Sequence, residues 1–261
     1  MATKDLAGQP TWDDIWHRES ARTADLRSYY DARISALFNE HVATGSRVLE
    51  VGCGGSVWLP LLARRKQCEV WGIDYSPRGV ELARANLERA GASGTIVLGD
   101  ALADNDLPMD HFDVLWSYGV VEHFDDVEAV VRRLAKHLRP GGLMITLVPN
   151  LAGAIGWLHR VVDPEIYAGH MRLLPEDLDR AHLDAGLAVE GAARYYGVFS
   201  IGVVNFNRFR KRLPTLVDRL FWAAVIGTQQ AACFPFRVVG KHPETRTFSP
   251  WAVGVYRRCD S

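Results

Sequence analysis

Cysteine is scarce in this chain and follows no recognisable pattern. The 261 residues include four cysteines, and no two of them form a Cys-x-x-Cys pair. Pairs at that spacing are typical of zinc sites, and small secreted domains carry dense sets of cysteines joined by disulfides. The sequence therefore favours neither a zinc site nor a disulfide framework, and we expect the protein in the reducing cytoplasm.

Long uninterrupted apolar runs are also missing. Residues 1–10 contain Lys4 and Asp5 and no apolar run, so we expect no secretion signal. The most apolar late stretch, residues 216–236, is interrupted by charged and amide side chains at Asp218, Arg219, Gln229 and Gln230. A membrane-spanning helix needs roughly 20 consecutive apolar residues. We therefore expect no stable membrane insertion.

An excess of charge of one sign is absent as well. With 30 basic and 31 acidic residues, the formal net charge is −1. A dedicated nucleic-acid-binding domain usually carries a strong positive charge. We therefore expect no nucleic-acid partner, and we interpret the basic cluster as a solvated surface; its members are Arg208, Arg210, Lys211 and Arg212.

From Arg47 onward, short apolar runs alternate with helical patterns. Buried strands are predicted by runs rich in β-branched residues at 48–51, 69–73, 95–98, 113–116 and 143–148. Between them, one helix is predicted after Ser76-Pro77, and a second carries an apolar stripe from Val127 to Leu138. Repeated strand–helix–strand units predict an α/β fold with a doubly wound parallel sheet, whose ligand crevice lies beyond the carboxyl ends of the strands.

Two aromatic-rich regions flank this core. Residues 11–42 predict one or two helices, and further helices are predicted at 175–185 and 216–233. The last strand, 251–257, has an alternation that lets it pair with 187–196. We divide the chain into an N-terminal helical cap, 1–45, and an α/β domain, 46–261, with insertions at about 150–175 and 197–248 that help to form a ligand pocket.

A glycine-rich turn, Glu50-Val51-Gly52-Cys53-Gly54-Gly55-Ser56, follows the first predicted strand. It does not match the dinucleotide fingerprint Gly-x-Gly-x-x-Gly, because Val57 stands at the last glycine position. Glu50 would repel a pyrophosphate but attract a ligand that carries an ammonium or sulfonium group. Asp74 and Asp100 end the next two strands, where they can accept hydrogen bonds from a ribose diol and an adenine amino group.

Five ordered segments resemble the class I S-adenosylmethionine-dependent methyltransferases. They are Val48–Gly54, Gly72–Pro77, Gly99–Ala101, Phe112–Val114 with Val121–His123, and Leu138–Gly142. The resemblance implies a Rossmann-like sheet of seven strands with the last one antiparallel, helices on both faces, and S-adenosylmethionine as cofactor. One departure is Ser56, where the family commonly has glycine. The cofactor residues implied are Glu50, Gly52, Cys53, Gly54, Asp74, Tyr75, Asp100, Ala101 and Ser117.

The segment Ser117–His123 limits the acceptor. It lacks the Pro-Pro-aromatic and Pro-Cys signatures of DNA methyltransferases, and the clustered Asp and Asn ligands of the metal-dependent catechol-type enzymes. We therefore expect no metal, and methyl transfer to an oxygen or nitrogen of a small molecule: a natural-product, aromatic, glycan or lipid-linked metabolite. Two alternatives stay open: a nicotinamide-dependent oxidoreductase, against which Glu50 and Val57 argue, and a noncatalytic protein that only binds S-adenosylmethionine.

A hydroxyl acceptor must lose a proton, and histidine is the side chain best matched to that task near neutral pH. His170 and His123 are the candidate catalytic bases, whereas His159 is interpreted as a core or surface histidine. Whether two chains form a homodimer is left open. The aromatic residues predicted to form the acceptor pocket are Trp12, Trp16, Tyr29, Tyr118, Tyr167 and Tyr195.

Overall fold

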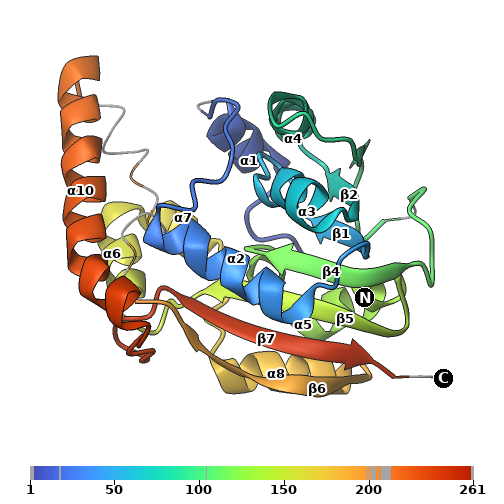
Figure 1. The fold of residues 1–261 in the computed structure, drawn as a ribbon. Helices are drawn as coiled ribbons and strands as arrows, with labels where there is room; N and C mark the ends of the chain where they lie inside the picture. Colours follow the sequence, from blue (N-terminus) through green and yellow to red (C-terminus); the bar gives the residue numbers. More distant parts are fainter. Residues whose placement is uncertain are drawn as a thin grey trace.

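The computed structural model describes residues 3–17, 19–103, 105–198, 200, 204, 206 and 213–259. In this part of the chain, seven strands form one sheet in the order β3-β2-β1-β4-β5-β7-β6, with helices on both faces (Figure 1). The predicted doubly wound α/β fold is therefore confirmed. The basic cluster at 208 and 210–212 lies outside the described residues.

The strands β1 to β5 run parallel, and β7 is antiparallel to both of its neighbours. The predicted pairing of the last strand with 187–196 is confirmed, for example by Tyr196 opposite Trp251. The strand bounds are Arg47–Val51 (β1), Glu69–Asp74 (β2), Thr95–Leu98 (β3), Phe112–Tyr118 (β4), Leu138–Pro149 (β5), Leu187–Tyr196 (β6) and Trp251–Arg258 (β7).

Several of the helices begin where the sequence supplies a side-chain cap or a proline. Ser76 caps α4, because its hydroxyl accepts a hydrogen bond from the Gly79 amide at 3.1 Å, and Pro77 stands in the first turn. The bounds are Gln9–Trp16 (α1), Tyr29–His41 (α2), Trp58–Lys66 (α3), Pro77–Arg89 (α4), Val121–His123 (η1, a 3₁₀ turn), Val127–Ala135 (α5), Ala154–Val162 (α6), Pro164–Ala168 (α7), Pro175–Asp184 (α8) and Thr215–Val239 (α10). Among these helices, none combines the length and apolar character needed to cross a membrane.

Two apolar layers hold the sheet in place. On one face, Phe38 of α2 packs against Trp116 of β4 with ring centroids 4.9 Å apart, and both side chains are fully buried. On the other face, Leu115 of β4 and Leu134 of α5 belong to a second buried cluster. Burying a large apolar side chain contributes about 1.5–3 kcal/mol, so these layers fix the strand ends that position the site.

One predicted boundary is wrong. The apolar stripe from Val127 was expected to continue as a helix to Leu138, but α5 ends at Ala135 and Leu138 begins β5, where it pairs with Phe112. A side chain at Gly142 would lie 2.9 Å from the Arg139 carbonyl and 3.0 Å from the Phe112 carbonyl. Residues 139–142, which were expected to stop the helix, therefore form a tight irregularity within β5. At position 142 this irregularity has space only for glycine.

Candidate active site

A cavity of about 320 Å³ opens at the carboxyl ends of β1, β2 and β4. Its size falls in the range of small-molecule sites, about 300–1,000 Å³. It brings together residues that the sequence analysis singled out separately: Trp12, Trp16, Glu50, Gly52, Gly54, Asp74, Tyr75, Tyr118, His123 and His170. The sequence reasoning missed further lining residues, among them Asp5, Arg22, Trp58, Glu122 and Trp251.

Two buried carboxylates lie at adjacent strand ends. The Glu50 carboxylate accepts a hydrogen bond from the Ser56 hydroxyl at 2.5 Å, and burial raises the pKa of Glu50 to about 8. Asp74 accepts hydrogen bonds from the amides of Gly54 at 2.7 Å and Ser76 at 2.8 Å. Burial still raises the pKa of Asp74 to about 6. Because desolvation disfavours the charged form of both groups, a cationic ligand would stabilise them here.

The glycine turn has no space for side chains. A Cβ atom at Gly54 would lie 2.5 Å from Nε1 of Trp16 and 2.9 Å from Oδ2 of Asp74. Gly52 has a φ of +68°, and a Cβ atom there would lie 2.6 Å from a Val120 methyl group. Both positions therefore require glycine. Ser56, the departure from the family pattern, lies at the end of this turn and hydrogen-bonds Glu50.

Helix α1 covers the turn. The Gln9 amide donates to the Tyr75 carbonyl at 2.9 Å, and the Ser76 hydroxyl donates to the Asp13 carboxylate. The Trp16 indole lies against Gly54, and its Nε1 is buried with no hydrogen-bond partner among the described residues. A buried N–H without a partner is rare and unfavourable. The cavity thus holds an unsatisfied donor next to two carboxylates.

An aromatic wall closes the other side. The Tyr30 hydroxyl donates to the Tyr118 hydroxyl at 2.6 Å, and the Trp251 ring lies 5.0 Å from that of Tyr118. Burial raises the pKa of both tyrosines, so the wall is uncharged. The sequence analysis included Tyr30 in the predicted N-terminal cap, residues 1–45, but only Tyr29 among the predicted pocket residues. Successive helical residues point about 100° apart, and nothing local shows which one faces a ligand.

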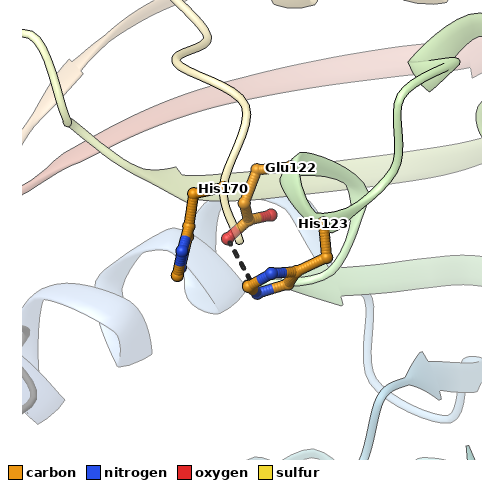
Figure 2. Close-up of side chains that lie close together, drawn as sticks. All are labelled: Glu122, His123 and His170. Carbon is orange, nitrogen blue, oxygen red and sulfur yellow. Dashed lines mark ion pairs between the residues drawn. The ribbon is translucent and has the colours of Figure 1, made fainter. Parts of the chain in front are cut away.

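Two histidines and a glutamate meet at the end of the cavity (Figure 2). His123 lies in η1 and His170 follows α7, and their ring centroids are 4.2 Å apart. Burial lowers the pKa of both rings, that of His170 to about 3, where the neighbouring His123 adds to the effect. Glu122 is also buried, which raises its pKa to about 8. At neutral pH both imidazoles are therefore uncharged.

His159 differs from its interpretation as a core or surface histidine. It is buried, but it lines the cavity, and its ring centroid lies 6.0 Å from that of His170. It lies on the buried face of helix α6, with Ile155 and Gly156. The apolar neighbours Leu158, Val161 and Val162 that suggested a core position are partly or largely exposed.

Other predicted site residues lie outside this cavity. Cys53 and Ser117 are buried next to it without lining it, and Asp100 lines a neighbouring pocket that also includes Asp5 and Tyr75. Ala101 packs against the buried cluster between the sheet and α5. Of the remaining aromatics, Tyr29 packs against Val198 and Cys233, Tyr167 lies on α7, and Tyr195 pairs with Ala252 in the sheet.

Comparison with known proteins identifies the family. A family model described as "Methyltransferase domain" matches residues 22–191. The chain is 30% identical over 194 residues to 27-O-demethylrifamycin SV methyltransferase of Amycolatopsis mediterranei, covering 72% of this chain and 70% of that protein. It is 32% identical over 157 residues to the ubiquinone biosynthesis O-methyltransferase of Chelativorans sp., covering 55% of this chain and 59% of that protein.

Solved structures share the fold. The [4+2]-cyclase SpnF superposes with a TM-score of 0.62 at 20% identity, covering 98% of this chain and 94% of the other. Phosphoethanolamine N-methyltransferase 2 of Haemonchus contortus, in complex with S-adenosyl-L-methionine, superposes with a TM-score of 0.59 at 15% identity, covering 88% of this chain and 53% of the other. At these identities the likeness shows the fold alone.

The geometry of the cavity fits the cofactor of this family. S-adenosylmethionine carries an ammonium and a sulfonium group, and the cavity offers the buried carboxylates of Glu50 and Asp74. No ion pair joins either carboxylate to a lysine or arginine of the described chain. The family match excludes the nicotinamide-dependent alternative. The chain belongs to the class I S-adenosylmethionine-dependent methyltransferases and is an enzyme that uses S-adenosylmethionine as its methyl donor.

Proposed function

We propose that this enzyme methylates an oxygen atom of a small acceptor with an aromatic or apolar body, bound in the cavity described above. The observation that carries the proposal is that one cavity joins the carboxylates of Glu50 and Asp74 to an uncharged aromatic wall and a pair of neutral histidines. The names of the relatives support oxygen over nitrogen, since they are O-methyltransferases.

The cofactor end of the cavity is assigned as follows. Glu50 holds the ammonium group, Asp74 and Tyr75 hold the ribose, and the absence of a side chain at Gly54 allows close approach once the Trp16 ring, which lies against it, moves aside. When bound, S-adenosylmethionine supplies a methyl group activated by its sulfonium charge. Cys53 and Ser117 would support this surface from behind, and Asp100 would contact the adenine from the adjoining pocket that it lines. Ala101 packs against the buried cluster next to that pocket, and its contact with the adenine remains a prediction, as do the other assignments.

The aromatic wall orients the acceptor. Because the Tyr30 hydroxyl donates to Tyr118, the Tyr118 proton is left to donate to an oxygen of the acceptor. Trp251 and Trp58 supply flat apolar surface for a ring. Methyl transfer from a sulfonium is an in-line displacement, so holding the acceptor and excluding water supply most of the rate enhancement.

The histidine end handles the acceptor proton. His123 and His170 are neutral, and each has a ring nitrogen that can interact with an acceptor hydroxyl. The depressed pKa values make both rings weak bases on their own. Removal of the proton therefore needs either a strongly acidic acceptor hydroxyl, such as a phenol, or a further group at this end of the cavity.

Methyl transfer to matched acceptors tests the proposal. Purified enzyme with S-adenosylmethionine would be offered hydroquinones and phenols alongside the corresponding anilines, with mass spectrometry of the products. We expect methyl ethers from the hydroxyl compounds. Methylation of the anilines alone would contradict an oxygen acceptor. Binding of S-adenosylhomocysteine without turnover on any of these hydroxyl compounds would contradict a phenolic or hydroquinone acceptor.

The residues that line the cavity also indicate the roles of three longer segments of the chain. We propose that residues 1–45 form a cap, supported by Trp12, Trp16 and Tyr30 in the cavity wall, and that 150–175 contributes to the acceptor pocket, supported by His159 and His170. Of the described residues in 197–248, none lines the cavity, so the role of that segment in the acceptor pocket remains a prediction. The cytoplasmic location and a homodimer remain predictions from the sequence.

A further inference from the structure

Glu122, His123 and His170 form a compact cluster of metal-ligating atoms. One carboxylate oxygen and one nitrogen from each ring all lie within 4.8 Å of one another. Figure 2 shows the three side chains converging from two segments of the chain, one after β4 and one after α7. The cluster lies in the cavity wall, where a ligand from the acceptor side can reach it.

Backbone carbonyls fix the orientation of both rings. Nδ1 of His123 lies 2.9 Å from the Gly169 carbonyl, and Nδ1 of His170 lies 2.6 Å from the Ile166 carbonyl. A carbonyl oxygen only accepts, so each Nδ1 carries the proton and each Nε2 keeps a free lone pair. Histidines that bind metals typically donate their second N–H to a carbonyl or carboxylate in this way. The two rings are therefore prepared as ligands.

Glu122 supplies the third group. It is 1% exposed, and neither carboxylate oxygen has a hydrogen-bond partner among the described residues. Its Oε1 lies 4.0 Å from Nε2 of His123. A buried carboxylate without a partner is strongly unfavourable, and a metal cation in the cavity would remove that penalty.

We propose that Glu122, His123 and His170 bind a divalent transition-metal ion of the Zn²⁺ type. Two imidazoles and one carboxylate favour such ions over Mg²⁺ and Ca²⁺, which prefer oxygen ligands throughout. With metal–ligand bonds of about 2.0–2.2 Å, tetrahedral ligand atoms lie roughly 3.4 Å apart. The ligand atoms, which lie within 4.8 Å of one another, would therefore need to move closer by up to about 1.4 Å.

A metal ion at this site would help the acceptor hydroxyl to lose its proton. This role rests on the proposed function. Three protein ligands leave a coordination position open to the cavity, as in catalytic zinc sites. An acceptor hydroxyl bound there has a lowered pKa and releases its proton to solvent. Its oxygen then forms a bond to the methyl carbon, while the electrons of the breaking carbon–sulfur bond pass to sulfur and neutralise the sulfonium. Glu122, His123 and His170 would act as ligands, in place of histidine bases.

Metal binding can be measured without methyl transfer. Chelator-treated enzyme, free of acceptor, would be titrated with Co²⁺, whose visible absorption reports coordination, and with Zn²⁺ by calorimetry. We expect one ion per chain. His170→Gln and Glu122→Gln should weaken binding by at least about 100-fold, since loss of outer-shell partners alone costs 10–100-fold. His111→Gln is the matched control, because His111 lies just before β4, at the opposite end of that strand from the cavity.

The outcomes separate this proposal from the proposed function. Circular dichroism and binding of S-adenosylhomocysteine establish that each variant is folded. Equal Co²⁺ affinity in wild type, His170→Gln and Glu122→Gln would overturn the site, as would full turnover by enzyme shown to contain no metal. Tight binding that depends on these residues, with no methylation of any hydroxyl acceptor, would keep the metal site and overturn the oxygen acceptor.

Discussion

The amide of Gly54 donates a hydrogen bond to Oδ2 of Asp74 at 2.7 Å, and this bond joins the glycine turn after β1 to the end of β2. Asp74 is the residue assigned to the ribose, and Gly54 belongs to the turn assigned to the methionine moiety. The other Asp74 oxygen accepts from the Ser76 amide, at the start of α4. One carboxylate therefore sets the relative position of both halves of the cofactor site.

Asp74→Asn should weaken cofactor binding. An amide has one acceptor oxygen where the carboxylate has two, so a bond to Gly54, to Ser76 or to the ribose is lost. Hydrogen bonds to a charged group are worth about 1–3 kcal/mol, and we expect a loss of that size in the affinity for S-adenosylhomocysteine. Calorimetry measures it, with the exposed Asp106→Asn as control. An unchanged affinity would contradict the ribose assignment.

Glu50 predicts a pH dependence of cofactor binding. Its pKa is about 8 in the cofactor-free protein, and only the ionised form attracts the ammonium group. Between about pH 5.5 and 7.5, where an α-amino group stays protonated, affinity should rise with pH by up to about tenfold per unit. Asp74, with its pKa raised to about 6, acts in the same direction. Calorimetry across this range should show proton release, reduced in Glu50→Gln; a flat profile would refute the assignment.

The same shift predicts how folding responds to pH. Because the folded-state pKa of Glu50 lies above the usual value of 4.5, protonated Glu50 favours the folded state. This contribution is complete below about pH 4.5 and is lost as pH rises through about 8. Without cofactor, wild type should therefore lose more unfolding free energy than Glu50→Gln between those values, as urea titrations would show. Parallel curves for the two proteins would contradict this prediction.

Ser56→Ala should destabilise the cofactor-free protein. The Ser56 hydroxyl donates to Glu50 and accepts from the amides of Trp58 and Leu59 at the start of α3. Loss of a helix cap costs about 1 kcal/mol, which lowers the melting temperature of a domain of this size by about 2–4 °C. Ser28→Ala is the matched control, since Ser28 directly precedes α2 and makes no side-chain cap bond. Equal melting of Ser56→Ala and wild type would argue against this role.

The strand ends were predictable because their signals are local. Glu50, Asp74 and the glycine turn sit next to short β-branched runs, and parallel strands bring their carboxyl ends to one edge. The start of β5 was not predictable, because Leu138 continues the apolar spacing of α5 and only its pairing with Phe112 makes it a strand residue. Long-range pairing overrides local pattern there.

The histidine cluster shows a second limit of prediction from the sequence. The sequence placed His123 and His170 after strand ends, yet it gave no reason to pair them with Glu122 as ligands. That grouping depends on the carbonyls of Gly169 and Ile166, which take up one nitrogen of each ring. The proposed metal site departs from the expectation of no metal, which rested on missing Asp and Asn ligands and did not consider side chains brought together by loops 46 residues apart in sequence.

Trp16 predicts a fluorescence signal for cofactor binding. A Cβ atom at Gly54 would lie 2.5 Å from Nε1 of Trp16, so the indole rests directly on the turn, with no space for a ligand between them. A cofactor that contacts this side of Gly54 must displace the ring. Titration with S-adenosylhomocysteine should therefore change the intrinsic fluorescence, and Trp16→Phe should remove most of the change. Trp157→Phe is the control, because Trp157 lies on α6 and is 65% exposed.

The rate of binding gives an independent test of the same contact. Since α1 is held over the turn by the Gln9 and Asp13 hydrogen bonds, moving the indole adds to the barrier that the cofactor must cross. Trp16→Ala removes the ring but leaves both bonds, so stopped-flow association should become faster than in wild type. An association rate in Trp16→Ala equal to or slower than that of wild type would mean that the cofactor reaches Glu50 and Asp74 without displacing Trp16.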